Sequence, residues 1–177
     1  FEHAKKLPKE KFSYGQGIAS VIPITGVFGI SELYAYTWHG ASDGVRIMRW
    51  SEAMKKNDIS AQIFSLFESQ EKAISTNYFF ALSAALFSDG LVVEIDEGSS
   101  ADIFLETILP ASGADMLIVF VGAHASVIIH EKFSFLPEHV CEMNGRTILV
   151  ILGEGSKAVY AENPPPILGG LFFTNKN

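Results

Sequence analysis

The second half of the chain contains one pattern three times, and this repeat constrains the fold more than any other feature. Each copy begins with an apolar run, followed by a turn of two to four residues rich in Gly or acidic residues. A second run, in which apolar and polar residues alternate, completes the copy. The apolar runs are 91–95, 117–121 and 148–152, and the turns follow at 96–99, 122–125 and 153–156. Aligned on their turns, the copies lie about 25–31 residues apart, a period typical of stacked arrays.

A single strand–turn–strand unit cannot bury both of its faces, so it must stack on a copy of itself. The repeat therefore predicts a mainly β fold, a right-handed parallel β-helix of about three rungs. We divide the chain into an irregular and helical lead-in, residues 1–90, and a β-helix core, residues 91–177, which is incomplete at its C-terminal end. The predicted interior stacks consist of Val93, Ile95, Val119, Val121, Val150 and Leu152.

The lead-in shows weaker local signals. Residues 12–38 are rich in glycine, aromatic and β-branched residues, and predict short strands or irregular structure. Residues 45–50 alternate as a strand with one buried face, and Ser51 can cap a short helix through Lys56. Helical spacing predicts helices over 60–73, with Ile63 among its apolar residues, and over 77–87. The sequence Ser88-Asp89-Gly90 would end the second helix.

Composition excludes several classes of protein. The apolar fraction of 48%, with 14 Phe, excludes a disordered chain. A net charge of −7 leaves no basic stripe for phosphates, which argues against nucleic-acid binding. The best membrane-span candidate, residues 15–30, is too short and is broken by Pro23 and glycines. Cys141 alone can form no internal disulfide, which fits a reducing cytoplasm. Since the chain begins at Phe1 and ends at Asn177 just after a strand-like run, we expect it to be part of a longer protein.

Read together, five segments resemble the core of the SufB/SufD family of iron–sulfur cluster assembly proteins. They are residues 44–53, 77–90, 116–133, 146–156 and 161–164. The likeness is strongest at 77–90, where aromatic, Leu, small and Asp-Gly positions follow the family's passage into its β-helix. Ser83 stands where that motif usually has Asn.

This resemblance implies a non-catalytic scaffold subunit that forms a complex with a SufB/SufD-type paralogue and a SufC-type ATPase. The full complex can hold an iron–sulfur cluster, but the family's cluster-holding residues and ATPase-binding helices lie further toward the C-terminus than this chain extends. No catalytic or metal residue is therefore carried over. The single cysteine favours a SufD-like over a SufB-like subunit. For this fragment we also expect self-association, through the open end of the β-helix near residues 167–173.

Cys141, with His139 and His130, forms the one cluster with suitable metal-ligand types. An iron–sulfur or structural zinc site usually needs two or more thiolates, so an ordinary polar loop explains this cluster better. In a strand, moreover, His130 and Glu131 would face opposite ways. His124 occupies a turn position where the other copies have glycine, and turn geometry explains it.

Two other functions remain open. A β-helix enzyme acting on polysaccharide would use converging acids, for which Asp96, Glu97, Asp102 and Glu106 are candidates; we interpret them as a solvated rim. A β-sandwich binding module, such as a jelly roll, would instead pair sequential strands antiparallel, and its turns would have no reason to stack.

Overall fold

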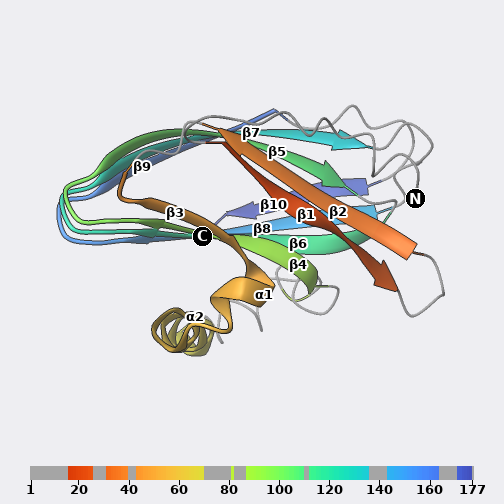
Figure 1. Cartoon of the computed structure of the whole chain (residues 1–177), viewed down its shortest axis with the longest axis horizontal. Coiled ribbons are helices and arrows are strands. Elements are labelled where there is room, and N and C mark those ends of the chain that lie inside the picture. The colour runs from red at the N-terminus through yellow and green to blue at the C-terminus, as the bar shows by residue number, and fades with distance from the viewer. Residues whose placement is uncertain are drawn as a thin grey trace.

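The computed structural model describes residues 16–25, 31–39, 43–69, 81, 87–109, 112–135, 143–163 and 171–176. Within these residues the chain is mainly β, with ten strands in two five-stranded sheets and two helices (Figure 1). Sheet A has the order β1 (Gln16–Thr25), β2 (Ser31–His39), β5 (Ser100–Leu109), β7 (Ser126–Phe135), β9 (Lys157–Asn163). Sheet B has the order β10 (Leu171–Lys176), β8 (Met143–Leu152), β6 (Ser112–Val121), β4 (Phe87–Ile95), β3 (Val45–Arg49). The predicted mainly β class is confirmed.

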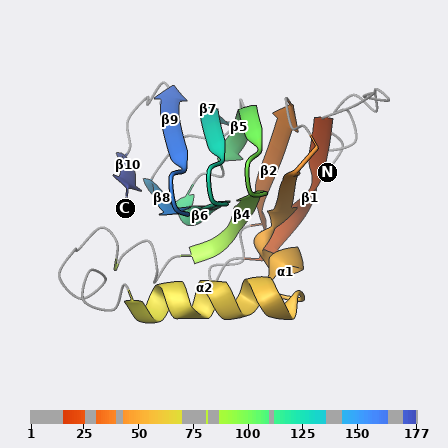
Figure 2. The same ribbon diagram turned by 90° about the vertical axis from the view of Figure 1, so that its left-hand side faces the viewer.

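The repeated segments form three strand–turn–strand units, β4–β5, β6–β7 and β8–β9, which lie side by side (Figure 2). Each unit contributes one strand to each sheet, and the strand is parallel to its neighbour in the next unit. The register steps are 26 residues between Ser100 and Ser126 and 31 between Asp115 and Arg146. The antiparallel pairing that a β-sandwich predicts does not occur among the described strands β4–β10.

Four-residue turns join sheet B to sheet A in each unit, and the three turns lie against one another at one edge of the molecule (Figure 1). Backbone hydrogen bonds of 2.8 Å tie Gly122 and Gly153 to the strand end of the preceding unit. A Cβ atom on Gly122 would lie 2.6 Å from the backbone nitrogen of Glu97, and one on Gly153 would lie 2.7 Å from that of Ala123. The turns therefore stack backbone on backbone, and only glycine fits at these two positions.

The third turn position has a left-handed backbone in every unit. The φ angles are 69° at Gly98, 56° at His124 and 65° at Gly155. The interpretation of His124 as a residue that meets turn geometry is confirmed. Its imidazole is exposed at the turn edge.

The main core lies between the sheets, where aliphatic side chains of sheet B meet Ile103 and Ile129 of sheet A. Val119 pairs in register with Val93 on one side and Val150 on the other, and Val121 pairs with Leu152. Val93 and Val119 are 0% exposed and Val121 is 3% exposed, as expected for interior stacks. Leu152, however, is 54% exposed, so its predicted burial is wrong. The reason is that β10 pairs with β8 only as far as Ile148, and no described strand covers the residues beyond.

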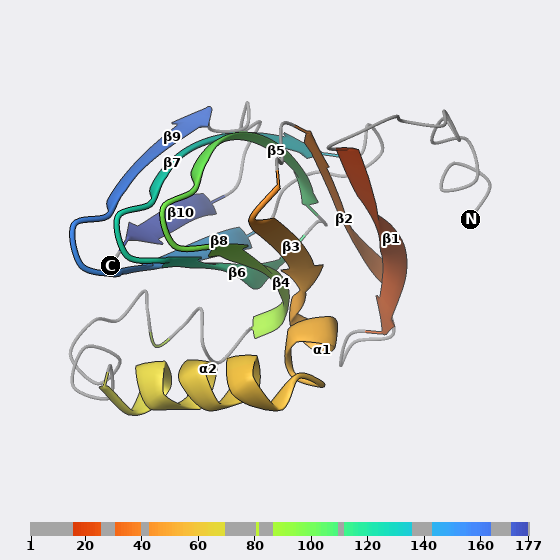
Figure 3. The ribbon, with the colours of Figure 1, turned by 60° about the vertical axis from the view of Figure 1, so that its left-hand side comes forward.

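A second apolar cluster lies on the outer face of sheet B. Helix α1 (Trp50–Ala53) and helix α2 (Asn57–Ser69) run along this face (Figure 3), and Ile59 and Ile63 pack against Val92, Ile118 and Leu149. The predicted apolar helix face is confirmed, although α2 begins three residues earlier than expected. The predicted cap at Ser51 is wrong, because α1 already begins at Trp50 and the carboxylate of Glu52 accepts the backbone N–H of Arg49.

The lead-in contributes strands to both sheets. β2 pairs antiparallel with β5, and β3 pairs antiparallel with β4, so strands from both sides of residue 90 share a sheet. The division of the chain into domains at that residue stays a prediction. Pro23 lies within β1, the edge strand of sheet A, where a missing backbone donor is tolerated.

The predicted helix over 77–87 lies outside the described residues, except for Ala81, which is helical, and Phe87, which begins β4. Ser88-Asp89-Gly90 belongs to β4, so its assignment as a helix end is wrong. Gly90 is needed for another reason: a Cβ atom there would lie 2.4 Å from the carbonyl oxygen of Met116 on β6. Close strand contact thus explains this glycine.

Among the described helices, none has the length and apolar character required to cross a bilayer.

Candidate functional site

The predicted metal-ligand candidates are only partly described. Cys141 and His139 lie outside the described residues. His130 lies on β7, where Nε2 is 3.2 Å from Oδ1 of Asp102 and the ring stacks on Phe104 at 4.6 Å between centroids. The described residues contain no group of three His, Cys, Asp or Glu side chains placed to hold a metal ion. The absence of a metal ligand in this chain stays a prediction.

The four carboxylates considered as paired acids occupy two places. Asp96 and Glu97 are exposed in the first turn, whereas Asp102 and Glu106 lie on the outer face of sheet A. Glu106 accepts hydrogen bonds from Lys132 at 3.0 Å and from Ser134 at 2.9 Å.

Opposing effects act on the pKa of Glu106, and partial burial alone would raise it. The hydrogen bonds from Lys132 and Ser134 and the charge of Lys132 outweigh this effect, so the pKa is lower than usual. Asp102 lies beside His130 and Glu106 pairs with Lys132, so each of these two carboxylates has its own side-chain partner on β7.

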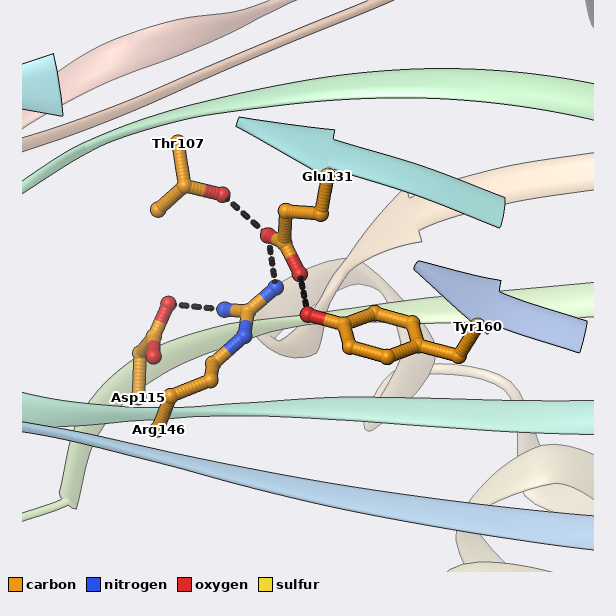
Figure 4. A network of polar contacts seen from close by, with 5 residues as sticks. All are labelled: Thr107, Asp115, Glu131, Arg146 and Tyr160. Atoms are coloured by element: carbon orange, nitrogen blue, oxygen red, sulfur yellow. Dashed lines mark hydrogen bonds and ion pairs between the residues drawn. The ribbon is translucent and has the colours of Figure 1, made fainter. Parts of the chain in front are cut away.

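The structure also assembles a polar network that sequence reasoning missed. Five side chains meet in the interior between the sheets (Figure 4): Thr107 on β5, Asp115 on β6, Glu131 on β7, Arg146 on β8 and Tyr160 on β9. Arg146 donates from Nη1 to Asp115 and from Nη2 to Oε1 of Glu131 at 2.5 Å. The Thr107 hydroxyl donates to the same Glu131 oxygen at 2.5 Å, and the Tyr160 hydroxyl donates to Oε2 at 2.6 Å. The network therefore connects all three units and both sheets.

This network is removed from solvent. The side chains of Arg146, Asp115 and Glu131 are all 0% exposed, and the guanidinium carbon lies 5.7 Å from the ring centroid of Phe133. Burial raises the pKa of Tyr160 well above its ordinary value, and the negative charge of Glu131 acts in the same direction. The phenol is therefore held protonated as a hydrogen-bond donor. Because these groups are away from water, removing one charged side chain would leave its partners buried without a compensating charge, which would destabilise the fold.

Strand alternation contained the signal for this network. Asp115 precedes the buried positions 117, 119 and 121 at steps of two, and Arg146 likewise precedes the buried position 148 and the half-buried position 150. Side chains at steps of two share a face, so both charges belong to the interior side of sheet B. The prediction that His130 and Glu131 face opposite ways is confirmed, since Glu131 points into the network and His130 lies on the outer face.

The end of the stack formed by β8 and β9 leaves apolar groups in contact with solvent. Leu152 is 54% exposed and Val159 is 56% exposed. Of the segment expected to form a binding surface, residues 167–170 lie outside the described part, and Leu171 begins β10. Because β10 is parallel to β8 and pairs as far as Ile148, it extends sheet B. Among the described strands, β9 is the corresponding edge of sheet A.

Searches against models of protein families and against curated proteins find no match for this chain.

Proposed function

We propose that this chain is a non-catalytic scaffold subunit of iron–sulfur cluster assembly, similar to the SufB/SufD family and closer to SufD than to SufB. It acts by forming a complex with a SufB-type paralogue and a SufC-type ATPase in the cytoplasm. The sequence resemblance over 44–177 motivates the family. The observation that best supports the scaffold role is the stacking of three turns of equal length, each with a left-handed third residue.

We interpret the three strand–turn–strand units as rungs of a right-handed parallel β-helix. In-register parallel pairing across β4, β6 and β8, and across β5, β7 and β9, supports this interpretation. A stack of this kind provides a rigid body with edges at its ends, and an open strand edge can pair with a strand of another chain. The partner surface would then be the end formed by β8, β9 and β10, where Leu152 and Val159 are exposed.

Complex formation tests the proposal. The chain would be co-expressed with the SufB-type paralogue and the SufC-type ATPase of the same genome, and complexes measured by size exclusion with light scattering. We expect a stable complex that is weakened by the double substitution Leu152→Lys and Val159→Lys. Phe64→Lys is the matched control, because Phe64 is similarly exposed, at 59%, but lies on α2. No complex with either partner would contradict the proposed function, and equal loss with the control would contradict the surface.

The same instrument tests self-association of the chain alone. We expect the parent to associate with rising concentration and the double lysine variant to remain monomeric. A parent chain that stays monomeric at all concentrations would contradict the prediction that this end is a self-association surface.

Cluster binding gives a second test. We expect the isolated chain to bind no iron–sulfur cluster, because Cys141 supplies one thiolate where a cluster site needs several. Anaerobic reconstitution followed by absorption spectroscopy and iron analysis measures this. Stoichiometric iron that disappears in Cys141→Ser would contradict the expectation and make Cys141 a ligand.

A further inference from the structure

The two outer faces of the molecule differ in how they are covered. α1 and α2 lie along the outer face of sheet B, whereas no described helix packs on the outer face of sheet A (Figure 3). Side chains on this face of β5, β7 and β9 stand in register across the strands. The outward columns are Asp102–Ile128–Val159, Phe104–His130–Ala161 and Glu106–Lys132–Asn163.

The middle column contains two stacked aromatic rings, on β5 and β7, and has no ring at its third position, on β9. The rings of Phe104 and His130 lie 4.6 Å apart and only 12° from parallel. That separation matches the spacing of about 4.8 Å between neighbouring strands, so a third ring in the column would stack on His130 at the same step. The third position is Ala161, whose methyl group leaves that space unfilled.

A hollow of about 350 Å³ occupies this position. It is lined by the middle column, by Glu106, Lys132 and Asn163 of the next column, and by the intervening residues Leu105, Glu131 and Glu162. Asp102 holds the imidazole of His130 through Nε2 at 3.2 Å, and Phe104 supports one ring face, so the opposite face is already oriented toward the hollow. Fixing the ring in advance removes an entropic cost that binding would otherwise carry.

We propose that this hollow is a binding site for a planar aromatic side chain of a partner polypeptide, which stacks on His130 as the third ring of the column. Offset-stacked rings at this separation attract one another beyond the area that they bury. A polypeptide fits better than a free small molecule for two reasons. The hollow is partly lined by β9, the edge strand of sheet A among the described strands, and the backbone of an edge strand can pair with an extended chain. The exposed apolar side chains Ile128 and Val159 in the adjacent column extend the contact. The inference is argued from the register and ring contacts of sheet A and not from the proposed function, although both place a partner beside Val159 on β9.

Nuclear magnetic resonance on the labelled chain tests this inference with three probes. These are indole, the capped tripeptide valine–tryptophan–valine, and the capped tripeptide valine–leucine–valine. We expect saturable upfield shifts of the His130 ring protons and the Ala161 methyl with the tryptophan peptide. We expect at least several-fold weaker binding for the leucine peptide and for indole.

Ala161→Phe fills the hollow from within and should abolish the shifts, whereas Lys157→Phe should retain them. Lys157 is the matched control, because it lies on the same strand and face but pairs with Ser126. Ala161 and Lys157 are both exposed, so folding should survive, and His130→Leu provides an independent loss of stacking. Equal binding of the two tripeptides, no saturable shift, or unchanged binding by Ala161→Phe would overturn the site. Indole binding as tightly as the tryptophan peptide would overturn the assignment to a polypeptide.

Discussion

The interior between the two sheets has two halves with different chemistry. Near the stacked turns it is mainly aliphatic, with residues such as Val93, Val119 and Ile103. Further along the same strands it holds Arg146 between Asp115 and Glu131. Aliphatic contacts have no direction, so the side chains of the first half would not by themselves prevent a slip of two residues along a strand. The charged half would not, because the guanidinium would lose both carboxylates. We infer that the apolar half supplies most of the stability and that the charged half, together with the glycine turns, fixes the strand register.

The largest expected effect comes from placing a charge in the apolar half. Val121→Asp buries a carboxylate with no cation beside it and should lower the free energy of unfolding by on the order of 5 kcal/mol. Urea unfolding followed by circular dichroism measures this. Leu152→Asp is the matched control in the same column, and it should cost less than about 1 kcal/mol because Leu152 is exposed. A similar loss of unfolding free energy in both variants would show that Val121 is not buried away from solvent.

Removing the cation from the charged half should have the next largest effect. Arg146→Ala leaves two buried carboxylates without their shared cation and should cost about 3–5 kcal/mol. Arg46→Ala is a close control, because Arg46 also pairs with two carboxylates, Glu94 at 3.1 Å and Asp96 at 3.3 Å, but is 56% exposed. Its loss should cost under about 1 kcal/mol. If the two arginines prove equivalent in urea unfolding, burial does not determine the importance of the network.

A smaller effect is expected from the phenol of the network. Tyr160→Phe removes one hydrogen bond to Glu131 and should cost about 1–3 kcal/mol at neutral pH. Because the folded-state pKa of Tyr160 is raised, its contribution is complete below the unfolded pKa of about 10 and is lost as the pH rises above that value. Unfolding curves between pH 7 and alkaline pH should show a steeper loss in the parent than in the variant. If the stability of the parent and of the variant fell equally with rising pH, burial would not raise the pKa of Tyr160.

The smallest effect is expected outside both halves, on the outer face of sheet A. The pKa of Glu106 is lowered, so its contribution is present above the unfolded value of 4.5 and is lost as the pH falls below it. Glu106→Gln should flatten this acid dependence and change stability at neutral pH by less than about 1 kcal/mol, since water screens the partly exposed pair. A larger change in thermal unfolding would mean that the outer face also contributes to the core.

The repeat was predictable because turn chemistry and strand alternation are local. The three turns, the left-handed residue His124 and the inward direction of Val119 and Val121 all follow from a few neighbouring residues. The exposure of Leu152 did not follow, because burial in a stack depends on whether the next strand reaches that residue, and the pairing of β10 with β8 ends at Ile148. The prediction of function rests on the family resemblance and stays a prediction.

The network was only half predictable. Alternation places Asp115 and Arg146 inside, but the contact of Arg146 with Glu131, 15 residues earlier in the chain, crosses between the sheets. Such contacts depend on how far apart the sheets stand. The residue types typical of metal sites instead indicated Cys141, His139 and His130. The first two lie outside the described part, and His130 lies on the opposite side of β7 from Glu131. The aromatic column of Phe104 and His130 likewise needed the register between β5 and β7.

The backbone-on-backbone packing of the turns has a consequence for how the protein can change in length. All three turns contain four residues, and Gly122 and Gly153 leave no room for a side chain, so an insertion there would separate neighbouring units. The connections that return from sheet A to sheet B vary in length, with two residues between Leu109 and Ser112 and seven between Phe135 and Met143. The 26- and 31-residue steps differ for this reason alone. Engineered loops, tags or grafted epitopes belong on that return side, where the chain already accepts additional length.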